Sequence, residues 1–117
     1  MINAFFIDLF SIIPAEADCY IQAPDIDSSI IRSLTVMNCN EPYLIRIRLS
    51  ERQPTLSDLE RSCHISQWIQ SMKIRKESKL LFEGYDGISY GIFSKEIIIP
   101  DWFQKKYSED FGVSANW

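Results

Sequence analysis

The dipeptide Asp86-Gly87 places the firmest constraint on how this chain can fold. It stands between two apolar runs, residues 79–85 and 88–93. A type I′ turn requires positive φ at both central residues, and this dipeptide is among the pairs that supply it. The sequence therefore predicts an antiparallel hairpin in which Tyr85 pairs with Ile88. In that register Gly91 lies opposite Phe82, where any side chain would crowd the ring.

Further strands are expected before this hairpin. In residues 43–50, Ile45 and Ile47 alternate with Arg46 and Arg48, which is the two-residue period of a half-buried strand. Residues 2–13 are apolar at both parities, a pattern that favours a strand covered on both faces. Residues 29–37 are expected to form a second long strand, and further strands are expected at residues 19–23 and 96–99, which brings the total to about five to seven strands.

The principal helix is expected from about residue 55 to about residue 75. Thr55 follows Pro54 and serves as the predicted N-cap, with Asp58 three residues later as in a capping box. Two apolar groups then fall on nearly opposite sides of this helix: Leu56, Leu59 and Cys63, and Ile65, Trp68, Ile69 and Met72. Either the helix breaks near residues 62–66, or a further chain segment or a partner covers one side.

A short C-terminal helix is expected at about residues 101–111, with Asp101 as its N-cap and Gln104 at the third position. The chain has 117 residues, of which 46% are hydrophobic and 24% charged, the profile of one globular domain over residues 1–117. The expected fold class is α+β: a mostly antiparallel sheet of about five to seven strands, one principal helix and this short C-terminal helix.

The charge balance bears on possible partners. Twelve Lys and Arg residues against sixteen Asp and Glu residues give a formal charge of −4. This is the wrong sign for phosphate backbones, so direct nucleic-acid binding is not expected. An acidic surface either speeds encounter with a basic protein or merely maintains solubility. No run of 18 apolar residues occurs, so no membrane-spanning helix is expected.

The cysteines indicate a reducing compartment. Cys19, Cys39 and Cys63 are odd in number and form no C-x-x-C pair, which argues against a disulfide scaffold or a structural zinc site. Reduced thiols indicate the cytoplasm. The glycine-rich phosphate loops, the H-E-x-x-H zinc motif and the G-x-S-x-G elbow are absent from the sequence. We therefore expect no cofactor and no metal.

Candidate catalytic groups are few. His64 is the single histidine, and it follows Cys63 directly; neighbours on a helix diverge by about 100°, which makes a poor nucleophile and base pair. Paired carboxylates would support acid–base chemistry if Asp8 met Glu83, or if Asp25 met Asp27 in a cleft. The alternative for Asp8 is a buried, hydrogen-bonded group, and for Asp25-x-Asp27 a solvated turn. No catalytic residue is predicted, and an enzyme is not expected.

Basic residues gather at two places. Arg46 and Arg48 share one face of a predicted strand, as a small phosphate-binding stripe or simply a solvated face. The second group, Lys73, Arg75, Lys76 and Lys79, is expected near the C-terminus of the principal helix, where positive charge complements the helix dipole.

The best candidates for a partner-binding surface combine aromatic and acidic residues at turns and helix ends. Aromatic anchors surrounded by charge suit a protein interface. The alternative is that Trp102 completes the core and Trp117 is a loose end. The candidate residues are Tyr85, Asp86, Asp101, Trp102, Glu109, Asp110 and Trp117.

In overall profile the chain resembles a bacterial immunity protein of a contact-dependent inhibition or related polymorphic toxin system. The shared profile covers the whole chain: a small, acidic α+β domain with reduced cysteines and no catalytic motif. The resemblance implies a cognate toxin domain, commonly an intracellular nuclease, whose active site is occluded. The remaining interpretations are a subunit of an obligate homo-oligomer and a small enzyme that uses dispersed carboxylates.

Overall fold

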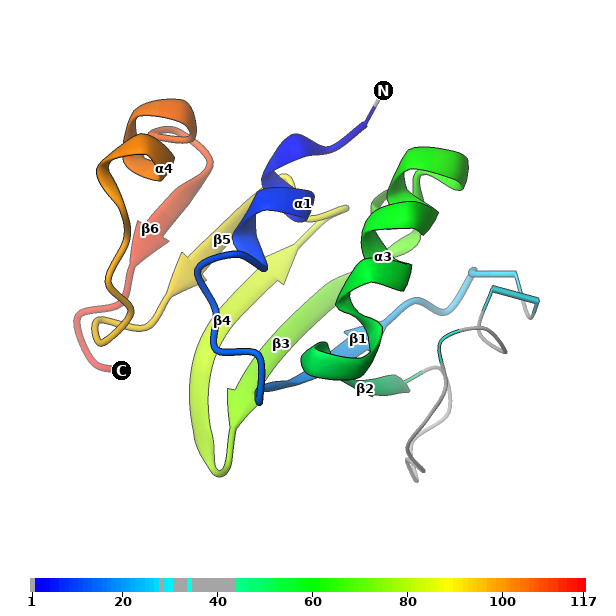
Figure 1. Ribbon diagram of the computed structural model, residues 1–117, viewed down its shortest axis with the longest axis horizontal. Helices are drawn as coiled ribbons and strands as arrows, with labels where there is room; N and C mark the ends of the chain where they lie inside the picture. The colour runs from blue at the N-terminus through cyan, green and yellow to red at the C-terminus, as the bar shows by residue number, and fades with distance from the viewer. Residues whose placement is uncertain (1, 28, 31–33, 35–43) are drawn as a thin grey trace.

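A six-stranded sheet forms the centre of the protein (Figure 1). The structure is a computed structural model that describes residues 2–27, 29, 30, 34 and 44–117. All neighbouring strands are antiparallel except β5 and β6, which confirms the expected α+β fold with a mostly antiparallel sheet. In spatial order the strands are β2 (Leu44–Arg48), β1 (Asp18–Gln22), β3 (Ser71–Lys76), β4 (Lys79–Tyr85), β5 (Tyr90–Phe93) and β6 (Phe111–Val113).

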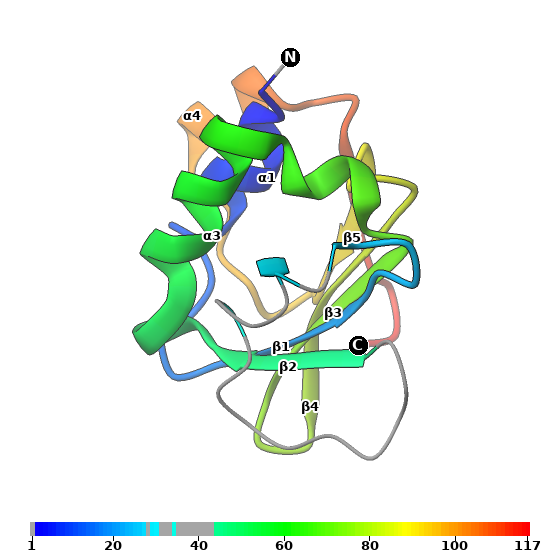
Figure 2. The ribbon, with the colours of Figure 1, turned by 90° about the vertical axis from the view of Figure 1, so that its right-hand side faces the viewer.

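The helices cover one face of this sheet. Figure 2 shows α1 (Ala4–Leu9), α3 (Leu49–Cys63) and α4 (Asp101–Lys106) on the same side of the strands. Side chains alternate between the two faces of a strand, so every second residue points toward these helices. The cross-strand partners confirm this for Cys19, Ile21, Ile45, Ile47, Met72, Ile74, Phe82 and Phe93, all of which are buried.

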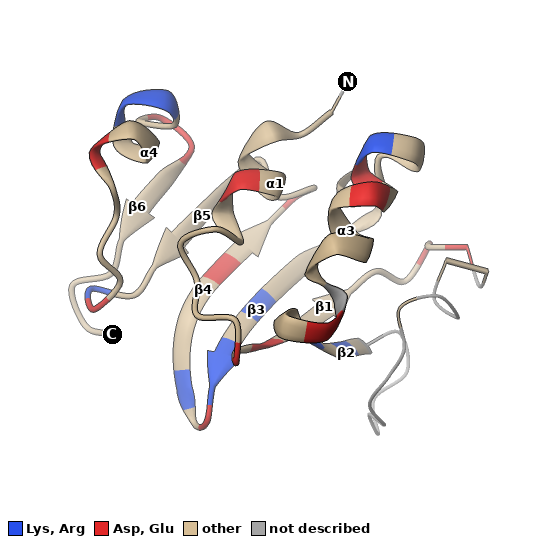
Figure 3. Ribbon diagram, in the orientation of Figure 1, with Lys and Arg blue, Asp and Glu red and all other residues tan. Residues whose placement is uncertain are grey.

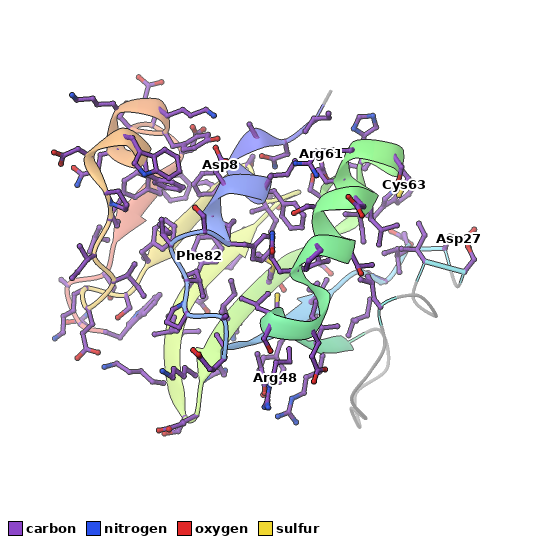
Figure 4. The ribbon with its side chains drawn as sticks, in the orientation of Figure 1. Asp8, Asp27, Arg48, Arg61, Cys63 and Phe82 are labelled. Atoms are coloured by element: carbon purple, nitrogen blue, oxygen red, sulfur yellow. The ribbon has the colours of Figure 1, made fainter. Side chains whose placement is uncertain are left out.

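Aromatic rings fill the space between the sheet and the two short helices. Phe5 on α1 and Phe103 on α4 pack against Phe93, and their ring centroids lie 6.4 and 5.7 Å from that of Phe93. The Phe82 ring lies 4.8 Å from Phe93, inside the molecule as Figure 4 shows. A Cβ atom on Gly91 would lie 2.2 Å from this ring, so the predicted reason for a glycine there holds.

The expected strand at residues 2–13 is wrong. Residues 4–9 form α1, because the Asn3 side chain accepts a hydrogen bond from the Phe6 amide and caps the helix. Phe5, Phe6 and Leu9 are buried. A short apolar run without a clear periodicity is compatible with a buried helix and with a buried strand.

The expected principal helix is partly wrong. Helix α3 begins at Leu49, not Thr55, and ends at Cys63, where His64 takes the left-handed conformation with φ 53°. The predicted break near residues 62–66 is therefore confirmed. Beyond it the chain forms the short 3-10 helix η1 (Ile65–Trp68) and then strand β3. The four basic residues from Lys73 to Lys79 consequently lie on the β3–β4 hairpin and not at a helix end.

The predicted strand at 43–50 is confirmed as β2, which ends at Arg48, and the strand at 19–23 is confirmed as β1. Of the expected strand at 29–37, residues 29, 30 and 34 are helical, and the other positions from 31 to 37 lie outside the described residues. The predicted loop at 38–42 also lies outside them.

The hairpin around Asp86 is present, but its predicted register is wrong. Tyr85 pairs with Tyr90 and Phe82 with Phe93, so the loop contains four residues, 86–89. Ile88 leaves the ladder because its side chain is fully buried in the core while its backbone adopts φ 57°.

Toward the C-terminus, the expected strand at 96–99 forms a turn and an irregular segment instead. The predicted C-terminal helix is confirmed at Asp101 but ends at Lys106. Pro100 is its N-cap, and no side chain caps it. Residues 111–113 add β6 parallel to β5, because α4 makes a crossover connection between the two strands.

Candidate functional site

An acidic recess lies at the end of the sheet where β1 and β4 finish and β3 begins. The Gln70 amide donates to the Gln22 carbonyl at 2.8 Å, and the Asp86 amide donates to the Gln70 carbonyl at 3.1 Å. These bonds bring three separate stretches of chain together. The recess has a volume of about 470 Å³ and is lined by Pro24, Asp25, Gln67, Trp68, Ile69, Gln70 and Asp86.

The lining combines one aromatic ring with two carboxylates. Trp68 ends η1 and is 42% exposed, a high value for so large an apolar side chain. Asp25 and Asp86 are exposed, and within the described ranges neither has an ion-pair partner. Such a surface can bind a cation through its charges and through the face of the indole ring.

The turn that carries Asp86 is strained and tightly held. Asp86, Gly87 and Ile88 have φ of 50°, 73° and 57°, and a β-branched residue such as Ile88 rarely adopts the left-handed region. The Asn3 side-chain amide donates to the Gly87 and Ile88 carbonyls, both at 3.0 Å. The Gly87 amide donates to the Ile69 carbonyl at 2.9 Å. Asp86 is therefore presented on a preorganised turn.

A buried carboxylate holds the opposite wall. Glu60 on α3 is fully buried; one of its oxygens accepts from the Asn3 backbone amide and the other from the Ser66 amide, both at 2.8 Å. Ser66 immediately precedes Gln67 and Trp68 in η1. Glu60 thus connects the segment that holds the turn to the segment that carries the tryptophan.

The partner-binding residues predicted from the sequence are distributed over several places. Asp86 lies in the recess, and Tyr85 precedes it on β4. The Asp110 carbonyl accepts from the Gly91 amide at 3.1 Å, which places Asp110 and Glu109 near the start of β5. Asp101 and Trp102 are exposed at the start of α4. The Trp117 carbonyl accepts from the Lys95 amide, beyond the other end of β5.

Of the residues that line the recess, only Asp86 was among those predictions. Trp68 was assigned to one side of a long helix, and Asp25 to a solvated turn. The signal that identifies Trp68 is the same conflict between apolar faces that predicted the helix break. Once the chain turns at His64, Trp68 no longer shares a surface with Met72, which is buried under the sheet's helices.

Asp8 and Glu83, a pair considered for catalysis, do not converge. Asp8 lies on α1 and accepts hydrogen bonds from the Tyr107 hydroxyl and from Lys106 at 3.0 Å, whereas Glu83 pairs with Lys73 on the opposite face of the sheet. Burial alone raises the pKa of Asp8, but the bonds from Tyr107 and Lys106 outweigh it and leave the pKa below its usual value. This matches the expected hydrogen-bonded role.

A second recess, of about 430 Å³, lies between α1 and α3. Asp8 and Arg61 line it from the two helices, as their positions in Figure 4 indicate. His64 lines neither of the two recesses. The Cys63 thiol donates to the Leu59 carbonyl at 3.1 Å, a bond within its own helix.

Two searches of the described ranges gave negative results. They contain no group of three or more His, Cys, Asp or Glu side chains placed to hold a metal ion. None of their helices is long and apolar enough to cross a membrane.

Comparison with other proteins adds no relative. No family model, no curated protein and no solved structure matches this chain. The functional conclusion therefore depends on the recess and its surroundings.

Proposed function

We propose that this protein is a non-catalytic binding module, an immunity protein that docks on a basic toxin domain and occludes its active site. The observation that carries the proposal is the recess at the sheet end. It is lined by Trp68 and by the carboxylates of Asp25 and Asp86, neither of which has an ion-pair partner among the described residues. A nuclease active site is basic because it binds phosphates, so two carboxylates in a fixed position are its electrostatic complement.

Rigidity supports the same proposal. Binding costs less when the interface is already ordered, since fewer side chains and loops lose freedom. The turn of residues 86–89 is fixed by the Asn3 side chain and by the Ile69 carbonyl, and η1 is fixed by Glu60. A strained turn kept at an exposed acidic position is more consistent with recognition than with packing alone.

The recess would form the centre of a larger contact. A standard interface removes about 800 Å² from each partner, roughly one-eighth of the 6708 Å² of accessible surface on this protein. Trp68, which is 42% exposed, is the aromatic anchor at the centre of this contact. Hot spots of this kind are rich in tryptophan and tyrosine at the centre of the contact.

The test begins with the reading frame immediately upstream, which we expect to encode a large secreted protein with a variable C-terminal domain, and coexpresses that domain with this protein. We expect the protein to restore growth and to bind the purified domain in surface plasmon resonance. Asp86→Lys should slow association, because charge reversal changes the encounter rate, and Trp68→Ala should speed dissociation.

Asp58→Lys is the matched control, since Asp58 is an exposed carboxylate on α3 outside the acidic recess. It should leave both rates close to those of the wild-type protein. Asp101→Lys tests the acidic surface at α4 in the same way. A toxin domain that neither binds nor is neutralised would reject the proposed function, and equal effects of Asp58→Lys and Asp86→Lys would reject the recess as the docking site.

A further inference from the structure

The face of the sheet away from the helices has a composition unlike the rest of the protein. Among the described residues no helix lies over this face (Figure 2). The cross-strand register defines one row across it, Arg46–Tyr20–Lys73–Glu83–Ile92. A second row, Gln22–Ser71–Tyr85–Tyr90, runs beside it at the recess end, and Arg48–Asp18–Arg75 flanks it on the other side.

Positive charge predominates on this outer face, although the whole chain has a formal charge of −4. Arg46 and Arg48 both bind Asp18, each with a nitrogen–oxygen distance of 2.9 Å, and Lys73 lies 3.5 Å from Glu83. With Arg75, which pairs with Asp18 across the strands, four cations share this face with two carboxylates, an excess of two positive charges. Figure 3 shows basic residues along β3, and Figure 4 shows that Arg48 extends away from α3. The net charge of the whole chain therefore gives no indication of this positively charged face.

Three tyrosines lie among these cations. The Arg46 guanidinium is 5.3 Å from the centre of the Tyr20 ring. Tyr90 extends across β6, because its hydroxyl would be 2.7 Å from a Cβ atom on Gly112, and its side chain is 45% exposed. Tyr85 extends along β4 toward Glu83, whose carboxylate raises the pKa of the Tyr85 hydroxyl. Tyr85 and Tyr90 therefore lie along the sheet surface and not away from it.

We propose that this outer face binds single-stranded nucleic acid, with bases stacked on Tyr85 and Tyr90 and phosphates held by Lys73 and Arg75. Exposed aromatic rings between cations are the chemistry by which proteins bind unpaired strands without reading their sequence. The proposal is independent of the toxin-binding function, because the acidic recess repels the same ligand.

The dimensions favour a strand of several nucleotides over a single nucleotide. Tyr20 on β1 and Tyr90 on β5 are separated by three strand spacings, about 14 Å. Tyr85 and Tyr90 line neither of the two recesses, whereas a mononucleotide site needs a cavity around one base. Duplexes present their bases only at the edges, so they cannot stack on these rings.

The experiment is fluorescence anisotropy of a labelled oligothymidylate of about 12 nucleotides, a length within the range bound by one small domain. We expect binding at low salt and a loss of about five- to a hundredfold for Tyr90→Ala, with Tyr90→Phe close to wild type. Lys73→Glu with Arg75→Glu should weaken binding and reduce the slope of log K against log salt by about 1.4.

The control is Lys105→Glu at an exposed position on α4. It should change the slope of log K against log salt by less than about 0.7, the value for one phosphate contact. Circular dichroism of each variant checks that it is folded. Absence of binding at low salt would overturn the proposal, as would equal affinity for a duplex of the same length. It would also be overturned if polyglutamate competed as well as unlabelled oligothymidylate, because the face would then recognise acidic protein segments.

Discussion

At the scale of single residues, a few polar side chains connect segments far apart in the sequence. Glu60 is the clearest case, since its two oxygens accept amide hydrogens from Asn3 and Ser66. Glu60→Gln keeps the shape but replaces one acceptor by a donor that faces another donor. We expect the free energy of unfolding to fall by about 1.5–3 kcal/mol, measured by urea denaturation.

The matched control for this change is Asp58→Asn on the same helix. Asp58 is exposed and lies 3.7 Å from Arg61, a surface pair that contributes little. Its loss should change stability by less than about 0.5 kcal/mol. If the two variants proved equally stable, the buried carboxylate would not connect α1 to η1 as described.

Tyr107 should make the free energy of unfolding depend on pH. Burial, and then the hydrogen bond to Asp8, raise the pKa of Tyr107 to about 12. A raised pKa in the folded state means that stability is fully present below about pH 10 and is lost as the pH rises toward 12. We expect the unfolding free energy of the wild-type protein to fall over this range, and Tyr107→Phe to remove this contribution.

The same bond acts in acid through Asp8, whose folded pKa is lowered. Its contribution is present above the unfolded value of about 3.9 and is lost as the pH falls through the folded value. Tyr107→Phe should therefore cost more stability at pH 7 than at pH 2. An equal cost at the two pH values would show that the hydroxyl contributes nothing through Asp8.

At the scale of elements, the sequence predicted best those strands that have a clear local pattern. The alternation in residues 43–50 and the Asp86-Gly87 dipeptide correctly indicated β2 and the β4–β5 hairpin. Alternation of Met72 and Ile74 with Lys73 and Arg75 also marks β3, but the helical spacing of Ile65, Trp68, Ile69 and Met72 hid it. Residues 4–9 have no distinguishing period, so tertiary packing decides that they form α1.

The start of α3 shows why its N-cap could not be found from the sequence. The Leu49 and Ser50 amides donate to the Ala17 and Ala15 carbonyls at 3.0 and 2.7 Å, so backbone and not a side chain satisfies the first turn. Thr55 lies inside the helix. Thr55→Ala should therefore change the unfolding free energy by less than about 0.5 kcal/mol, whereas removal of a true N-cap costs about 1 kcal/mol.

The candidate site was predictable only in part, for a reason that belongs to the element scale. Asp86 and Tyr85 were found because they stand at a recognisable turn. Asp25 and Trp68 join them only through hydrogen bonds that connect the ends of β1, β3 and β4, and no local pattern contains that information. The register, which local turn chemistry predicted wrongly, decides which side chains share a surface.

At the scale of the whole molecule, the acidic recess and the cations of the outer face have opposite charge and lie apart. Ser71 pairs with Tyr85 beside the recess, and Arg75 is four residues further along β3, about 13 Å away. Changes this far apart without shared partners are usually additive. Asp86→Lys should therefore slow toxin association, and Arg75→Glu should weaken oligonucleotide binding without changing toxin association. The double variant should show both losses, each unchanged in size when measured by surface plasmon resonance and anisotropy. If Arg75→Glu also slowed toxin association, the sheet face would belong to the protein interface, and one continuous surface would replace two.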